Sequence, residues 1–199
     1  QRMKQIPQYV NLFEKASLGE PDLNPISNAI VAFERTLVSK NVPLDRYLTG
    51  DQNALSAEAK QGLALFEVKA GCIRCHDGPY MSDGKPHRLG VPENPEVFSD
   101  PFRIITMRST LKFLGTPNYS NMRNDPGHFA VTKNYGDFGT FITPTLREVA
   151  RTAPYMHNGM LPTLEAVIDF YNAGGGQTDL PKSPLLQPLG LSAGEKAAL

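Results

Sequence analysis

The feature that most constrains this chain of 199 residues is the run Cys72-Ile73-Arg74-Cys75-His76. Two thiols at this spacing reach the two vinyl groups of one haem, and the imidazole beside the second thiol reaches the iron. We therefore expect Cys72 and Cys75 to attach one haem c and His76 to bind its iron. A chain with this motif folds around a flat, largely apolar cofactor.

Other uses of two closely spaced cysteines fit less well. A tetrahedral zinc site needs further ligands, and the sequence has no second C-x-x-C and no nearby H-x-x-x-H. A thioredoxin-like redox pair is expected in a βαβ context, which the helical patterning here does not indicate. Because both cysteines of the chain are used in this way, no structural disulfide is expected. Haem attachment outside the bacterial inner membrane predicts a periplasmic location.

The balance of charge excludes two classes of partner. Twenty basic residues match twenty acidic ones, so the formal net charge is zero. Nucleic acids and anionic membrane surfaces both favour proteins with a basic excess, and we expect neither as the main partner. No apolar run approaches the length of a transmembrane helix.

Three stretches carry helical patterns, with a long irregular segment between them. Apolar residues from Ile26 to Leu37 fall on one helix face. A second helix is predicted from Ser56, as N-cap, to Gly71, and a third from Leu164 to Tyr171 after Thr163. Between residues 77 and 143, glycines and prolines recur every few residues, which favours few long helices. The predicted fold is mainly α, a cytochrome c-like domain with long irregular haem-wrapping loops and a small β-hairpin.

Both ends of the sequence resemble cuts in a longer chain. It starts at Gln1 without a secretory signal. Near the other end, Ser192 and Glu195 have the spacing of a capping box, which predicts a helix that Leu199 truncates.

The residue on the far side of the iron decides what the haem can do. An open position binds peroxide or oxygen, whereas a filled one limits the haem to electron transfer. The residues alone leave several candidates for this sixth ligand: Tyr171, Met107, Met122, Met156, Met160, His87, His128 and His157.

Several blocks together resemble the bacterial di-haem cytochrome c peroxidases and the related methylamine-utilisation maturase, which oxidises protein tryptophans. The resemblance covers nearly the whole chain, and its most specific block ends at Gly159. The blocks are Phe33-Glu34-Arg35-Thr36-Leu37, Asp45-Arg46-Tyr47-Leu48, Gly62 to His76, Thr143-Pro144-Thr145-Leu146-Arg147 and Thr152-Ala153-Pro154-Tyr155-Met156-His157-Asn158-Gly159.

The resemblance implies a division into two parts. In that family an N-terminal haem domain reacts with hydrogen peroxide and a C-terminal haem domain supplies electrons. Residues 1–50 are expected to be the helical end of an upstream haem domain, and residues 51–199 the C-terminal haem domain. Since only one C-x-x-C-H is present, the second haem and all catalytic residues are expected upstream, in a domain or chain outside this sequence.

The resemblance also narrows the sixth ligand. The peroxidases place a methionine fourteen residues beyond the histidine of the block that contains His157, and the maturase branch places a tyrosine there. In this sequence the position is Tyr171, which implies ligation by His76 and Tyr171, with Met156 or Met160 as the alternative. Phenolate favours Fe(III), whereas a thioether sulfur favours Fe(II).

Two further sites follow from the resemblance. The family holds calcium between its domains, and the matching backbone carbonyls are those of Thr152 and Pro154. Arg147 and Arg151 are candidates for pairing with haem propionates, because a guanidinium group matches a carboxylate.

Three functions remain open at this point. The first is the electron-transfer half of a periplasmic di-haem peroxidase that reduces hydrogen peroxide and takes electrons from a small cytochrome c or cupredoxin. The second is a maturase-like oxidase that acts on a protein substrate; Tyr171 favours it, although the chain has no Trp for a relay. The third is a mono-haem electron carrier.

Overall fold

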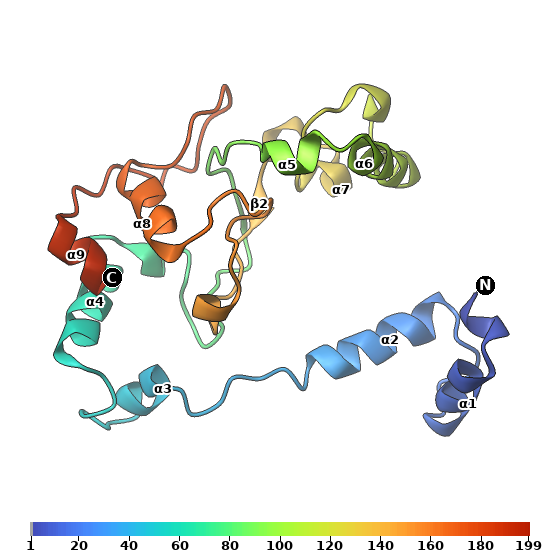
Figure 1. The fold of residues 1–199 in the computed structure, drawn as a ribbon, viewed down its shortest axis with the longest axis horizontal. Coiled ribbons are helices and arrows are strands. Elements are labelled where there is room, and N and C mark those ends of the chain that lie inside the picture. The colour runs from blue at the N-terminus through green and yellow to red at the C-terminus, as the bar shows by residue number, and fades with distance from the viewer. Residues whose placement is uncertain (1) are drawn as a thin grey trace. The chain divides into compact units, whose positions relative to one another are not determined.

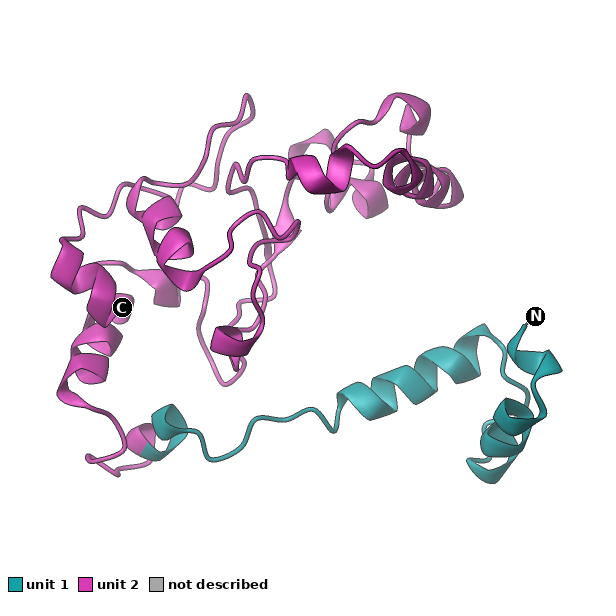
Figure 2. Cartoon of the chain, viewed as in Figure 1, with its two compact units in different colours: residues 1–46 teal, residues 47–199 magenta. Residues whose placement is uncertain are grey.

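The computed structural model describes residues 2–199, and these residues form two compact units. The first unit comprises residues 1–46 and the second comprises residues 47–199 (Figure 2). No helix of the described residues is long and apolar enough to cross a membrane.

The chain is mainly helical, as predicted, with a single two-stranded sheet in its described part (Figure 1). The α-helices are α1 (Pro7–Lys15), α2 (Leu23–Glu34), α3 (Pro43–Leu48), α4 (Ala57–Glu67), α5 (Pro95–Phe98), α6 (Pro101–Phe113), α7 (Phe129–Thr132), α8 (Leu164–Asn172) and α9 (Ala193–Ala198). Short 3-10 turns lie at η1 (Met3–Gln5), η2 (Cys72–Arg74), η3 (Tyr119–Asn121), η4 (Tyr135–Asp137) and η5 (Val149–Arg151).

The three predicted helix starts with a capping residue are confirmed. The side chains of Ser56, Thr163 and Ser192 accept hydrogen bonds from the backbone at the starts of α4, α8 and α9. Ser192 and Glu195 form the complete capping box. Each cap satisfies a backbone N–H group that has no partner inside its helix, and this is why these starts can be read from sequence.

The helix α2 ends earlier than its apolar pattern suggested. It stops at Glu34, so that Leu37 lies beyond it. The hydroxyl of Thr36 donates to the carbonyl of Phe33 at 2.7 Å. That side chain takes a carbonyl that a further helical turn would have used, and the chain leaves the helix there.

The segment 77–143 holds an unexpected long helix. The helix α6 has 13 residues, the most of any helix in the described chain. Asp100 accepts a hydrogen bond from the N–H of Phe102, and Pro101 occupies the first turn. A proline in that position starts a helix rather than breaking it, because its missing N–H would have no partner there.

The predicted β-hairpin takes a different form. The strands β1 (Pro86–His87) and β2 (Phe141–Ile142) pair antiparallel, with Pro86 opposite Ile142 and His87 opposite Phe141. Residues 88–140 lie between them in the chain, so no tight turn sets the register. The pair instead closes a long excursion that contains α5, α6 and α7.

The second unit has few fully buried apolar side chains of its own. Phe129 is completely buried and packs its ring 4.9 Å from Tyr135 and 5.6 Å from Phe138 between centroids. In the described part of this unit, the side chain of Pro126 is also fully buried, and the other buried apolar side chains are Ala70, Leu111 and Leu191. A core this small leaves the larger part of the unit arranged around a cavity, which is described below.

Gly62 allows α4 and α9 to pack closely. A Cβ on Gly62 would collide with the backbone carbonyl of Ala198. We predict that Gly62→Ala lowers the free energy of unfolding by about 1–3 kcal/mol, because overpacking outweighs the better helix propensity of Ala. Denaturant unfolding of the haem-loaded protein measures this. Gly194→Ala is the matched control, since a Cβ there meets nothing, and equal effects of both changes would contradict the packing argument.

The start of α9 also carries a pH-sensitive contact. Lys69 Nζ lies 2.7 Å from the Glu195 carboxylate, and this hydrogen bond together with the Ser192 cap lowers the pKa of Glu195 to about 2. The contact is therefore present above the unfolded-state pKa near 4.5 and is lost as the pH falls toward 2. We predict that Glu195→Gln weakens the dependence of stability on pH between 5 and 2. Thermal unfolding against pH checks this, with the exposed Glu67→Gln as control.

Candidate haem site

The cysteine motif lies in a tight turn that follows α4. Gly71 adopts a left-handed conformation with φ of 60°, which a glycine reaches without strain. The turn η2 follows, and the backbone N–H of His76 donates to the carbonyl of Cys72 at 2.9 Å. Both thiols are free and half-buried, and burial raises the pKa of each. The two cysteines thus lie on one turn, at the edge of the buried part of the unit.

A cavity of about 880 Å³ opens next to this turn. Cys72, Cys75 and His76 line it, and so does Tyr171 from α8. Much of the remaining wall is apolar and is contributed by Phe66, Val91, Phe141, Leu146, Val149, Leu164, Val167, Ile168, Leu185 and Leu186. Segments far apart in the sequence thus meet around one space of the size typical for a cofactor.

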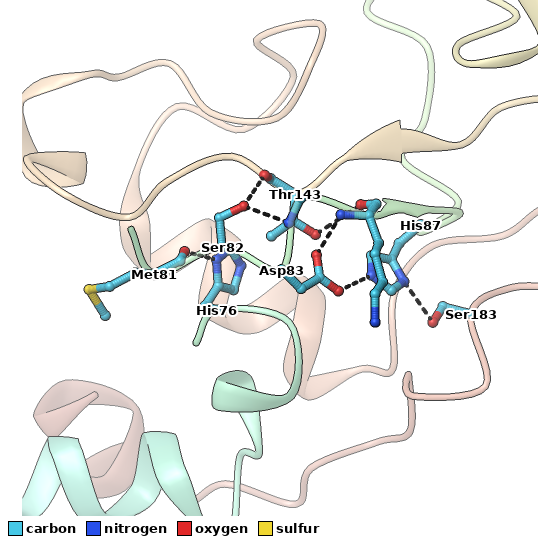
Figure 3. Close-up of polar contacts among 9 residues, drawn as sticks. His76, Met81, Ser82, Asp83, His87, Thr143 and Ser183 are labelled. Carbon is cyan, nitrogen blue, oxygen red and sulfur yellow. Dashed lines mark hydrogen bonds and ion pairs between the residues drawn. The ribbon is translucent and has the colours of Figure 1, made fainter. Parts of the chain in front are cut away.

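The ring of His76 is held by a backbone carbonyl at its Nδ1 atom. Its Nδ1 lies 3.0 Å from the carbonyl oxygen of Met81, so a proton on Nδ1 would donate to that carbonyl and leave Nε2 with a free lone pair (Figure 3). Burial is the main cause that lowers the pKa of His76. A neutral imidazole is the form that binds a metal.

The loop that carries the Met81 carbonyl is fixed by contacts across the sheet. The Ser82 hydroxyl donates to the carbonyl of Thr143 at 2.7 Å, and the N–H of Asp83 donates to the carbonyl of Cys75 at 2.7 Å. Thr143 directly follows β2, so this small sheet anchors the loop next to His76 (Figure 3). The orientation of the imidazole is therefore set by structure that lies far away in the sequence.

A polar group beside the motif was not predicted from sequence. His87 Nε2 lies 2.8 Å from the Asp83 carboxylate, and its Nδ1 lies 3.4 Å from the hydroxyl of Ser183. The side chains of Asp83 and His87 are only 10% and 16% exposed. The i, i+4 spacing of Asp83 and His87 was the one available signal, and in an irregular segment such spacing indicates nothing by itself.

Tyr171 lies in the cavity wall as a neutral phenol. Loss of hydration, with the neighbouring Cys75 and Cys72 as smaller contributions, raises its pKa to about 12. A bound cation would be needed to remove its proton at neutral pH, as cations do for bound water and thiols. The position suits a ligand that ionises only when the iron is present.

The other sixth-ligand candidates separate by position. Met156, His157 and His87 line the cavity. The ring of His157 stacks on Phe141 with a centroid distance of 3.6 Å, which places it in the wall. Four candidates are not among the cavity-lining residues in the described chain: Met107, Met122, His128 and Met160.

Arg147 contacts the loop that follows His76 and is not among the residues that line the cavity. Its Nε donates to the carbonyl of Pro79 at 2.5 Å, and Arg151 pairs with Glu148 at 3.3 Å. Two arginines line the cavity, Arg74 and Arg88, and the Arg88 guanidinium donates to the carbonyls of Phe138, Pro181 and Gly136. Propionate pairing by Arg147 stays a prediction. Sequence reasoning did not single out Arg88.

The proposed calcium carbonyls belong to the same wall. Thr152 and Pro154 both line the cavity, next to the turn closed by the pairing of Tyr155 with Leu161. Among the described residues, the group of three His, Cys, Asp or Glu side chains that could hold a cation consists of Cys75, Asp83 and His87. The calcium site therefore stays a prediction.

The residues present fit a covalent haem c. The donor set joins two thiols, a neutral imidazole with a free nitrogen and a phenol, around one apolar cavity. The ordinary iron–sulfur clusters need four cysteines, whereas this chain has two. When bound, the haem would supply a one-electron couple, and the protein would hold it through Cys72, Cys75 and His76.

The chain is similar to proteins of one family. The di-haem cytochrome c peroxidase family matches residues 1–53. The chain is 47% identical over 199 residues to the cytochrome-c peroxidase IdrP2 of Denitromonas iodatirespirans, a match that covers 100% of this chain and 53% of that protein. It is 34% identical over 177 residues to the methylamine utilization protein MauG of Methylorubrum extorquens, which covers 88% of this chain and 42% of MauG.

A solved structure shows the same fold. The crystal structure of a MauG-like protein associated with microbial copper homeostasis superposes with a TM-score of 0.68 at 28% identity. The match covers 99% of this chain and 57% of that one. The chain spans about half the length of the curated relatives it matches. Together with the haem-type site, these matches show that the chain belongs to the superfamily of di-haem cytochrome c peroxidases and MauG-like proteins, which are oxidoreductases.

Proposed function

We propose that residues 47–199 are the electron-transfer haem c domain of a periplasmic di-haem peroxidase. The observation that carries this proposal is the meeting of Cys72, Cys75, His76 and Tyr171 in one apolar cavity. If His76 and Tyr171 both bound the iron, no position would be left for peroxide. A haem held in this way passes electrons and does not itself react with the oxidant.

The second haem belongs, on this proposal, to an upstream domain. Residues 1–46 form a unit of their own and lie within the segment that matches the di-haem family. Within this unit, Ile30 and Phe33 of α2 are 53% and 63% exposed, as expected for a helix that completes another domain. The curated relatives are about twice as long as this chain, which leaves room for such a domain.

The overall reaction balances with a one-electron donor. Hydrogen peroxide takes up two protons and two electrons to give two molecules of water. The electrons come from two molecules of a reduced small cytochrome c or cupredoxin, each oxidised by one electron. In this scheme the chain receives each electron at its own haem and delivers it to the upstream one.

A MauG-like oxidase is the second candidate, and one observation favours it. Tyr171 occupies the cavity wall at the position where the maturase branch of the family carries a tyrosine. A phenolate ligand stabilises Fe(III), which makes the haem a weaker acceptor of electrons from ordinary cytochromes. In this version the final electron source is an amino-acid side chain of a protein substrate.

Steady-state turnover of the intact native protein tests the proposal. We expect hydrogen peroxide to be consumed with the oxidation of two equivalents of reduced cytochrome c, and His76→Ala to abolish the oxidation. Met160→Leu is the control, because Met160 does not line the cavity. Peroxide consumption that leaves the reduced cytochrome untouched would favour the oxidase. No consumption at all would overturn both enzymatic functions.

A further inference from the structure

One buried carboxylate lies directly beside the haem-attachment motif. The backbone N–H of Asp83 donates to the carbonyl of Cys75 at 2.7 Å. The sulfur of Cys75, a carboxylate oxygen of Asp83 and a ring nitrogen of His87 all lie within 4.8 Å of one another. Figure 3 shows the Asp83 carboxylate pointing toward His87 and the end of β2.

This carboxylate is ionised despite its burial. Burial alone would raise its pKa, but hydrogen bonds from His87, from the N–H of Lys85 and from Thr143 outweigh it and lower the pKa of Asp83 to about 2. The N–H of Lys85 lies 2.9 Å from one oxygen and His87 Nε2 lies 2.8 Å from the other. Both oxygens are therefore held, and the group is negative throughout the pH range in which such a protein works.

The field of this charge already reaches the sulfur that haem would occupy. The Asp83 carboxylate lies within 4.8 Å of the Cys75 sulfur. The cations near Cys75 are Lys85 and Arg74, and the Arg74 guanidinium is directed to the carbonyls of Gly71 and Leu185. Asp77, the other acid near Cys75, is exposed to solvent, and its charge acts on Cys75 more weakly than that of Asp83.

We propose that Asp83 tunes the reduction potential of the haem, as a fixed negative charge beside the Cys75 attachment point that favours Fe(III) over Fe(II). His87 is the positioning residue that holds the charge in place. Reduction removes one positive charge from the iron, so an anion in a poorly hydrated site opposes it. The proposal rests on the proposed function, since it requires haem on Cys75.

The size of the effect follows from the separation and the surroundings. The interaction between two charges weakens with their separation and with the hydration of their surroundings. We expect removal of the Asp83 charge to shift the ferric–ferrous equilibrium about tenfold toward the ferrous form. For a one-electron couple this is about 59 mV.

Redox titration of the full-length haem-loaded protein tests this. Asp83→Asn keeps the shape of the side chain and should raise the midpoint potential by about 59 mV, which corresponds to the tenfold shift toward the ferrous form. Asp83→Glu restores a charge and should return the potential toward that of the native protein. Asp77→Asn is the matched control, because it removes an exposed acid from the same loop and should shift the potential less.

The outcomes separate a tuning role from a structural one. An unchanged potential in Asp83→Asn, with haem attached and the absorption spectrum preserved, would overturn the proposal. If Asp83→Asn does not accumulate with haem, Asp83→Ser serves as a second neutral variant. Failure of both to retain haem would assign Asp83 to stability instead. A native protein without haem on Cys75 would refute the proposed function, which is a different result from an unresponsive potential.

Discussion

The double variant Cys72→Ala/Cys75→Ala should yield a chain without bound haem and without a cooperative folded state. The cavity between these residues and Tyr171 measures about 880 Å³. Without haem, the apolar side chains in the cavity wall would face water, and a loss of about 1.5–3 kcal/mol for each large side chain left exposed would remove much of the roughly 5–15 kcal/mol that stabilises a typical domain. The buried apolar side chains of the second unit are too few to compensate.

Two measurements check this result. Absorption of the purified variant should show no haem band, and thermal unfolding followed by circular dichroism should show no transition. Val68→Ala is a suitable control, because this side chain is 80% exposed and close to the motif in sequence. A double variant that keeps the native unfolding transition would show that the fold does not depend on the cofactor.

The second large effect is expected from the replacement of Tyr171. Tyr171→Met exchanges a hard anionic donor for a thioether, which favours Fe(II), and should raise the reduction potential by a sizeable part of the roughly 0.8 V range that axial ligands span. Tyr171→Phe removes the donor altogether and should open the position to small ligands such as cyanide. Redox titration and cyanide binding followed by absorption measure the two effects.

The methionines provide the controls for this experiment. Met156→Leu tests the one methionine among the alternatives that lines the cavity, and Met160→Leu tests the one that does not. Both changes should leave the potential unaltered. A methionine-to-iron charge-transfer band in the native protein, lost in Met156→Leu or Met160→Leu, would exclude Tyr171 as the ligand.

The parts of the structure that depend on local chemistry could be predicted from the sequence. Ser56, Thr163 and Ser192 cap their helices as expected, because an N-cap uses a side chain and a backbone group only two or three residues apart. The mainly helical character and the family were predicted as well, the latter from short blocks such as the one that ends at Gly159. The ligand roles of Cys72, Cys75, His76 and Tyr171 remain predictions, and the structure adds that these four residues line one cavity.

The parts that depend on distant contacts could not be predicted. The strands β1 and β2 pair across a long excursion, so no turn motif marks them. Asp83 is hydrogen-bonded by Thr143 and His87 contacts Ser183, and both partners lie far along the chain, so no local pattern predicts these contacts. The helix α6 differs from the expectation of irregular structure in a proline-rich segment, because Pro101 after Asp100 begins a helix.

Covalent attachment of haem to Cys72 and Cys75 is tested by the intact mass of the denatured native protein. We predict that the chain keeps the added mass of haem after denaturation and acid extraction. A peptide that spans residues 72–76 should carry one haem, with no titratable thiol. A peptide of unmodified mass with two titratable thiols would contradict the account.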